Sequence, residues 1–413
     1  MIDTFSLLQK YTGISKYSQS EVITPQNIVK DMVDLLPPEV FNPKATFFDP
    51  AVKSGRFLIE IYNRLMASDL MKQAFPNEQD RSKHILENQL YGFATSQTAA
   101  IVVRKTLYND PLAVGNIRFA GGNITKESVQ GAFNNMKFDV VIGNPPYNND
   151  IYLDFVTLGH SLASQYTIMI TPAKWQAKGG KKNVDFRKHI VPYMSKIVFY
   201  PCCYDVFTGS DDSDYPKIHS GVSYYLIVKD ECNKKHIKEI CKVNKELNAS
   251  WVHDGKYIDT LYDTRIVNII AKVQKAGISR LKISNNGMVG KNNVGICNMF
   301  SWGGFLNRQG ETLSLISPYI WTDFDTVRNS MVLRTFDNAD EANSLISYIN
   351  TRFIRFLAFI SCTSQNINNE NTWRFVPDPG AFDHIFTDDE LYTTYGLTPE
   401  EIKIIESVIK ERK

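Results

Sequence analysis

Asn144, Pro145, Pro146 and Tyr147 directly follow an apolar segment and carry the clearest chemistry in this sequence. The carboxamide oxygen of Asn144 and the carbonyl of Pro145 can accept both N–H bonds of a planar amine, which frees its lone pair for attack. Pro146 stiffens the turn because its φ is fixed, and Tyr147 offers a ring for stacking on a displaced base. The stretch predicts activation of the exocyclic amine of adenine or cytosine, with a plain proline turn as the alternative. We expect Asn144 to have no packing role beyond the strand.

A second candidate site lies at residues 49–55, where an apolar strand leads into a helix. The small residues Ala51 and Gly55 would let a cofactor lie close to the backbone beside Asp49. An ordinary strand-to-helix turn has the same pattern, so this signal becomes specific only together with Asn-Pro-Pro-Tyr. Upstream, Thr24 and Pro25 predict a helix start that Thr24 would cap. That role is compatible with a functional one, because the free N–H groups of a helix start can also hold a carboxylate.

Three loop residues have both a functional and a plain structural interpretation. Asn123, which follows two glycines, would place a polar side chain beside an adenine ring, or it belongs to a simple turn. Phe207 and Tyr215 precede the last apolar strand of the first half, where either ring would stack on a base or simply pack in the loop.

The most basic segment spans residues 174–189 and includes Lys178, Lys181 and Lys182 beside a Gly-Gly pair. Such a segment suits contact with nucleic-acid phosphates. The alternative is a solvated loop. Because the net charge of the chain is only +2, a nucleic acid would have to meet a local basic surface of this kind.

The elements that must position these residues alternate between short apolar strands and amphipathic helices. Strands are predicted at 45–48, 88–93, 138–142, 166–170, 196–200 and 223–228, and helices at 57–66 and 98–107. This alternation predicts an α/β fold with a mostly parallel sheet. Ligands of such sheets bind beyond the carboxyl ends of the strands, and Asp49, Asn123 and Asn144 all fall at or near such ends.

The 413 residues suffice for two domains. The strand–helix alternation stops near residue 229, which predicts a catalytic domain at 1–235 and a mixed recognition region at 236–413, with helices at 336–360 and 398–410. No apolar run approaches the roughly 20 residues of a membrane span, the first residues do not form a secretory signal, and none of the six cysteines shows Cys-x-x-Cys spacing. We therefore expect a cytoplasmic enzyme with reduced thiols and no metal site.

Taken together, residues 20–230 resemble the gamma-type adenine-N6 DNA methyltransferases, in the order Thr-Pro helix, cofactor turn, Asn-Pro-Pro-Tyr and C-terminal recognition region. The turn Asp-Pro-Ala-x-Lys-Ser-Gly is similar to that of a methylase branch of restriction–modification systems. The resemblance implies a Rossmann-like methyltransferase sheet, S-adenosyl-L-methionine as cofactor, and double-stranded DNA from which the target adenine is flipped. It leaves open a separate restriction endonuclease as a second partner.

The resemblance also implies roles for individual residues. For the cofactor, Thr24 would bind the methionine carboxylate, Asp49, Ala51 and Gly55 would line the amino-acid moiety, and Asn123 would lie near the adenine. For the target base, Asn144 and Pro145 would hold the amine, and Tyr147 and Phe207 would stack on the flipped ring. Tyr215 is the alternative to Phe207 as the second stacking ring. The chain departs from many relatives at two points. Lys53 replaces a glycine, and no acidic residue follows the second strand, where Thr95 offers one neutral hydrogen bond to the ribose instead.

Three alternatives remain at this stage: a methyltransferase acting on adenine in RNA, one acting on a protein glutamine, and a non-catalytic DNA-binding subunit with the same fold. The long region after the sheet favours a protein that recognises a DNA sequence.

Overall fold

The structure is a computed structural model, which describes residues 22–113, 115–119, 121, 124–200, 203–207, 221–230, 237–243, 246–253, 258–259, 263–277, 279–281, 292–297, 318–321, 330–361, 371–409 and 411. A nine-stranded sheet forms its larger part, in the order β3-β2-β1-β4-β5-β7-β6-β8-β9. The strands are β1 (Phe47–Val52), β2 (Leu90–Ala94), β3 (Ile117–Phe119), β4 (Phe138–Gly143), β5 (Ala163–Pro172), β6 (Met194–Tyr200), β7 (Val222–Val228), β8 (Ile237–Val243) and β9 (Glu246–His253).

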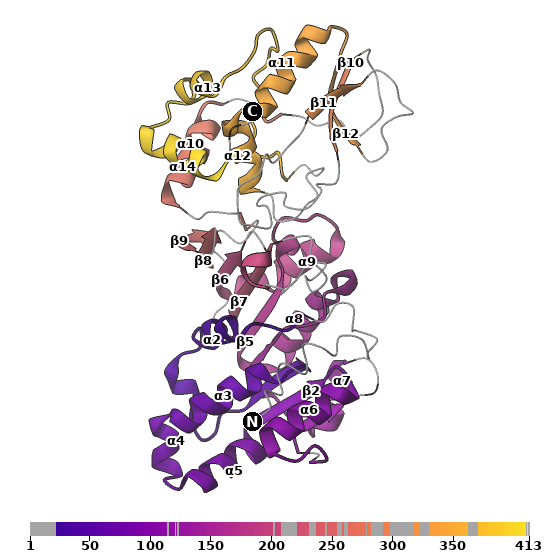
Figure 1. Ribbon diagram of the computed structural model, residues 1–413, viewed down its shortest axis with the longest axis vertical. Helices are drawn as coiled ribbons and strands as arrows, with labels where there is room; N and C mark the ends of the chain where they lie inside the picture. The colour runs from indigo at the N-terminus through magenta and orange to yellow at the C-terminus, as the bar shows by residue number, and fades with distance from the viewer. Residues whose placement is uncertain are drawn as a thin grey trace.

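The first five strands in this order are all parallel, while β7 runs antiparallel to both β5 and β6. Helices cover the sheet: α2 (Gln26–Val33), α3 (Arg56–Ala67), α4 (Asp69–Ala74), α5 (Glu78–Asn88), α6 (Gln97–Tyr108), α7 (Lys126–Ala132), α8 (Ile151–Leu162) and α9 (Lys181–His189) (Figure 1). Every residue of β1 is buried, as expected for a parallel strand covered on both faces. The predicted α/β fold with a mostly parallel sheet is confirmed.

The central strands are held together by aromatic packing. Phe48 of β1 and Phe138 of the neighbouring β4 stack with ring centroids 4.5 Å apart, and Phe133 meets both rings edge-on. Such ring pairs add about 0.5–1.5 kcal/mol to the burial of their area. The packing fixes β1 beside β4, with Phe47 opposite Val140, so the carboxyl ends of these two strands lie next to each other.

The strand predicted at 45–48 continues through Pro50 to Val52. A proline interrupts most strands because it cannot donate to the ladder. Here the register between β1 and β2 shifts between Asp49 and Val52, so Pro50 lies in an irregular stretch where no regular ladder bond is required of it.

A smaller three-stranded sheet, ordered β11-β10-β12, lies with the last five helices at the other end of the molecule (Figure 1). Its strands are β10 (Asn292–Cys297), β11 (Pro318–Trp321) and β12 (Ser330–Phe336), and the helices are α10 (Thr264–Lys275), α11 (Ala339–Asn350), α12 (Arg352–Ile360), α13 (Asp388–Thr394) and α14 (Pro399–Val408). The helix predicted at 336–360 is two helices, because the Thr351 side chain caps α12. Strands β8 and β9 extend the large sheet, so the boundary predicted at residue 235 falls before its last two strands.

No helix within the described part of the chain is long and apolar enough to cross a membrane.

Candidate active site

Asn144 follows the last residue of β4 and is only 3% exposed. Its amide Nδ2 donates to the carbonyl oxygen of Val22 at 2.9 Å and to the hydroxyl of Thr24 at 3.1 Å. Its Oδ1 atom is buried and has no hydrogen-bond partner among the described residues. Because a carbonyl can only accept, the bond to Val22 fixes which end of the amide is NH₂ and which is oxygen.

The expectation that Asn144 has no packing role beyond the strand is therefore wrong. Its amide ties β4 to the segment before α2, more than 100 residues away in the sequence. This tie holds Oδ1 in one orientation as an unused acceptor. A buried acceptor without a partner costs free energy in the folded protein, and such groups call for a functional explanation.

Thr24 does not cap the helix that follows it. Helix α2 begins at Gln26 with Pro25 as its N-cap and has no side-chain cap. The Thr24 hydroxyl is instead buried and accepts from Asn144, which leaves its own proton available for donation. The Thr24 carbonyl accepts from Arg56 Nη1 at 2.8 Å, so α3 also holds this segment.

A pocket lies at the carboxyl ends of β1 and β4. It brings together five of the residues predicted from the sequence, and it adds Lys53 and Arg56, to which the motif analysis gave no role. Its lining consists of Val22, Ile23, Thr24, Asp49, Ala51, Lys53, Ser54, Gly55, Arg56, Phe57 and Asn144. The contribution of Val22 through its carbonyl has no signal in the sequence, because any residue carries that group.

Asp49 is the buried carboxylate of this pocket, with 2% of its surface exposed. Burial raises its pKa to about 7, although the backbone N–H of Ala51, 2.9 Å from Oδ1, and the nearby charge of Lys53 act in the opposite direction. A carboxylate that is partly protonated near neutral pH is typical of functional sites rather than of structural ion pairs.

Two glycines allow the close packing of this pocket. A Cβ atom on Gly143 would lie 2.7 Å from Oδ1 of Asp49, so only glycine lets β4 pass beside the carboxylate. Gly55 precedes α3 with a φ of 75°, a conformation that favours glycine, and a Cβ there would press on Val103 at 3.0 Å.

Pro145 and Pro146 are buried, and Tyr147 is partly exposed. The Tyr147 hydroxyl lies 3.5 Å from the carbonyl of Ile170, which is a weak contact. Burial raises the pKa of Tyr147 well above its ordinary value, so this hydroxyl stays neutral and does not act as a base at physiological pH.

The structure does not bring every predicted residue to the pocket. The Thr95 hydroxyl donates to the carbonyl of Val52 at 3.4 Å and is not part of the lining. Phe207, at 4% exposure, packs in the hydrophobic core, so stacking on a base would require it to leave that packing. Asn123 and Tyr215 lie outside the described residues.

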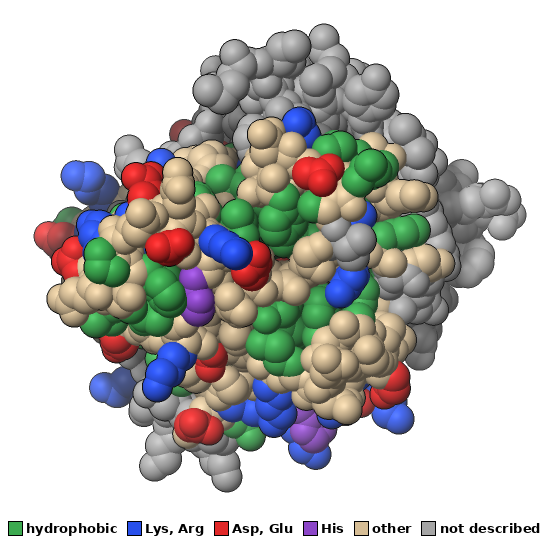
Figure 2. Space-filling model, turned by 90° about the horizontal axis from the view of Figure 1, so that it is seen from below, with side chains coloured by type: hydrophobic (Ala, Val, Ile, Leu, Met, Phe, Trp, Pro, Cys, Tyr) green, Lys and Arg blue, Asp and Glu red, His purple; other side chains and the backbone are tan. Residues whose placement is uncertain are grey.

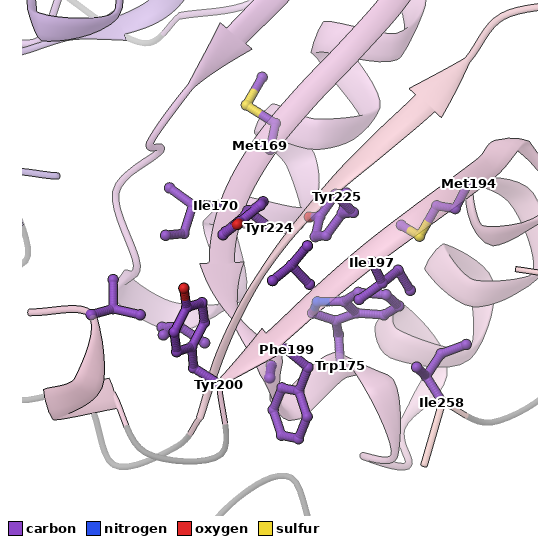
Figure 3. Packing of buried hydrophobic residues seen from close by; sticks show 14 of the residues in the cluster. Met169, Ile170, Trp175, Met194, Ile197, Phe199, Tyr200, Tyr224, Tyr225 and Ile258 are labelled. Atoms are coloured by element: carbon purple, nitrogen blue, oxygen red, sulfur yellow. The ribbon is translucent and has the colours of Figure 1, made fainter. Parts of the chain in front are cut away.

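Two of the predicted phosphate-binding lysines have carboxylate partners at the start of α8. Lys178 pairs with Asp150 at 2.9 Å and Lys182 with Asp154 at 2.7 Å, while Lys181 is exposed at the first position of α9. The aromatic residue of this basic segment, Trp175, is buried, as Figure 3 shows, and its indole N–H donates to Thr171 at 3.2 Å.

Within the described residues, no group of three or more His, Cys, Asp or Glu side chains could hold a metal ion.

The sheet order, with the reversed strand β7 between β5 and β6, is that of the S-adenosylmethionine-dependent methyltransferase fold. Residues 5–196 match the family described as N-6 DNA Methylase. The resemblance to adenine-N6 methyltransferases is thereby confirmed for the part of the chain that carries the pocket.

The chain is 25% identical to an uncharacterized adenine-specific methylase of Mycoplasma pneumoniae, in a match that covers 45% of this chain and 65% of that protein. Among solved structures it is similar to the M protein of the type I restriction enzyme EcoKI, with 16% identity, a TM-score of 0.42, and coverage of 54% of this chain and 48% of that one. A methyltransferase subunit of a type I restriction–modification system from Streptococcus thermophilus has 14% identity, a TM-score of 0.38, and coverage of 60% and 52%. The chain thus spans less than two thirds of each of these proteins.

Proposed function

We propose that this chain transfers a methyl group from S-adenosyl-L-methionine to the N6 amine of adenine in double-stranded DNA. The observation that carries this proposal is the buried, unpartnered Oδ1 of Asn144, held in place by Val22 and Thr24 beside the pocket of Asp49. The family match over residues 5–196 supports the same chemistry.

The residues of the pocket fit this cofactor. Asp49 offers a carboxylate for an ammonium group, Thr24 offers a hydroxyl proton, and the turn at Gly55 allows a ligand close to the backbone. When bound, S-adenosyl-L-methionine supplies the electrophilic methyl group. Thr24, Asp49, Ala51 and Gly55 would hold its amino-acid part, while Asn123 and Thr95 would lie near its adenosine part.

The Asn-Pro-Pro-Tyr turn would hold the target base. Asn144 Oδ1 and the carbonyl of Pro145 accept the two N–H bonds of the amine, and the ring of Tyr147 stacks on the flipped adenine. Phe207 would be the second stacking ring. The amine needs no base before attack, because its lone pair attacks a strongly electrophilic methyl group and the proton can leave to water afterwards. Catalysis then consists of positioning and charge stabilisation.

The test is a methyl-transfer assay with labelled cofactor and three substrates: duplex DNA free of N6-methyladenine, RNA of matched sequence, and a protein mixture. Label recovered as N6-methyladenine from the duplex supports the proposal. Label found only in RNA or in glutamine would assign the chain to one of the other two enzyme classes. Cofactor binding without transfer to any of the three would make it a non-catalytic DNA-binding subunit.

We further propose that residues 236–413 form the region that recognises the DNA sequence and that Lys178, Lys181 and Lys182 contact phosphates. Figure 2 shows the end of the catalytic part, where cationic and anionic side chains are interspersed. The described residues of this face therefore form no continuous basic surface. The basic segment is the better candidate, because solvent-exposed ion pairs such as Lys182–Asp154 are worth only about 0–1 kcal/mol and can exchange for phosphates.

Replacing all three lysines with alanine should weaken the binding of every duplex about equally. The slope of log affinity against log salt should flatten by about one unit for each lysine that pairs with a phosphate in the wild type, and the preferred sequence should stay the same. An unchanged salt slope would instead assign this segment to a solvated loop. A separate restriction endonuclease would be the second partner, and co-purification with a nuclease would test this.

A further inference from the structure

Lys53 lies in the turn between β1 and α3 and lines the same pocket as Thr24, Asp49 and Asn144. It is partly buried, and its Nζ atom lies 3.4 Å from the carbonyl of Val22, the same carbonyl that accepts from Asn144. Its ammonium group is close enough to Asp49 to act on that carboxylate electrostatically. The pocket thus holds a cation and an anion within one small space.

The cationic side of the pocket has a second contribution. Helix α3 begins at Arg56 and runs for 12 residues, so its first N–H groups and its dipole present positive charge at the pocket. Thr24 adds a hydroxyl that accepts from Asn144 and can itself donate. All these donors favour an anion, whereas Asp49 is the one carboxylate among the lining residues and favours a cation.

A pocket with these two sides fits a zwitterion, in which a carboxylate and an ammonium group are attached to one carbon. We propose that Lys53, together with Thr24, binds the α-carboxylate of the amino-acid part of the cofactor, and that it makes the pocket select ligands that carry this carboxylate. Asp49 takes the ammonium group. This inference rests on the proposed function, because it assumes that the ligand is S-adenosyl-L-methionine.

A purely structural role for Lys53 makes a different prediction. If Lys53 only balances the charge of Asp49 or ties Val22 in place, its loss weakens all ligands of the pocket alike. If it binds the carboxylate, its loss weakens only ligands that have one. The decarboxylated form of S-adenosyl-L-methionine keeps the adenosine, the sulfonium and the amine, so it separates these two cases.

The experiment is calorimetric titration of the full chain with S-adenosyl-L-methionine and with its decarboxylated form. Three variants are compared with the wild type. Lys53→Gln removes the charge but keeps an N–H group toward Val22, and Lys53→Arg keeps the charge. The third variant, Lys30→Gln, is the control. Lys30 is an exposed lysine of α2, so its replacement makes the same change of net charge away from the pocket.

We expect the wild type and Lys30→Gln to prefer the carboxylate-bearing ligand by tenfold or more. Lys53→Gln should reduce affinity for that ligand about tenfold, leave the decarboxylated form within twofold, and so abolish most of the preference. Lys53→Arg should retain it.

Equal losses for both ligands in Lys53→Gln would overturn the inference and leave the proposed function standing. A wild type that binds neither ligand would overturn both. If Lys53→Gln fails to fold, the inference is tested by whether the wild type and Lys53→Arg prefer S-adenosyl-L-methionine over its decarboxylated form. A wild type that binds both ligands equally well would refute carboxylate binding.

Discussion

Replacing Asn144 with alanine tests the central argument, because this side chain has two separable duties. Its Nδ2 atom holds Val22 and Thr24, and its Oδ1 atom is the unused acceptor. The first duty belongs to the folded protein and the second to the reaction. Asn144→Ala should therefore lower both stability and turnover, but by different amounts.

The contacts of Asn144 allow both the loss of stability and the loss of turnover to be estimated. The variant loses one buried and one partly buried hydrogen bond. It leaves the Thr24 hydroxyl without the amide donor and the Val22 carbonyl with only the 3.4 Å contact to Lys53, which should cost about 1–3 kcal/mol of unfolding free energy. Removing an acceptor that acts mainly in the transition state should cost on the order of 3 kcal/mol or more in activation free energy, which is at least about a hundredfold in turnover.

The assays are urea denaturation for stability and single-turnover methyl transfer at saturating cofactor and DNA for the chemical step. Asn88→Ala is the matched control, since Asn88 is exposed on α5 and its amide donates only to groups of His84. That control should keep full activity and gain slightly in stability, because alanine favours a helix.

Turnover of Asn144→Ala within threefold of wild type would refute the mechanism. Loss of activity together with an unchanged unfolding free energy would refute the structural tie to Val22 and Thr24.

Three further predictions follow from the same pocket. Gly143→Ala should destabilise the protein by about 1–3 kcal/mol, because its Cβ would lie 2.7 Å from Asp49 Oδ1, while Gly131→Ala, with no atom within 4 Å of the added Cβ, should be neutral or stabilising in urea denaturation. Burial raises the pKa of Asp49 from 3.8 to about 7, so between these pH values the folded protein holds a proton on Asp49 that the unfolded chain has lost. The contribution of Asp49 to stability should therefore fall as the pH rises from 4 to 7, and Asp49→Asn should remove that decline. Tyr147→Phe should transfer methyl groups within about threefold of wild type, since the ring does the stacking and the hydroxyl makes a weak 3.5 Å contact with Ile170. Tyr147→Ala should lose about 1–3 kcal/mol of base stacking, and a severe effect of the Phe variant would give the hydroxyl a role in the reaction.

Much of the large sheet could be predicted from the sequence because its central strands are short, apolar and largely buried. The predicted strand at 138–142 is β4 almost to the residue, and the predicted helix at 98–107 is α6 with one more residue at each end. Strands β8 and β9 were not predicted, because their polar, lysine-rich sequence lacks the apolar pattern of the central strands. Their membership in the sheet depends on pairing with β6, which is a long-range contact.

In the candidate site, too, contacts within one motif could be predicted and contacts between distant segments could not. Residues within one motif, such as Asp49 and Gly55, could be assigned to the pocket because the strand-to-helix turn itself brings them together. The bond from Asn144 to Val22 could not, since it joins residues 122 positions apart and uses a backbone carbonyl. The pairing of Lys178 with Asp150 was likewise invisible, because a charge count over a segment does not show what lies opposite it.

The short segment before α2 links the two halves of the proposed reaction. The Val22 carbonyl accepts from Asn144 and lies 3.4 Å from Lys53, while Thr24 accepts from Asn144 through its hydroxyl and from Arg56 through its carbonyl. Every one of these groups lines the pocket proposed for the cofactor. A ligand that orders this segment would therefore also fix the amide of Asn144, and with it the acceptor for the target amine. The amine-binding turn and the cofactor turn both contact the segment before α2. The acceptor for the target amine would therefore be held in place only when the cofactor pocket is ordered.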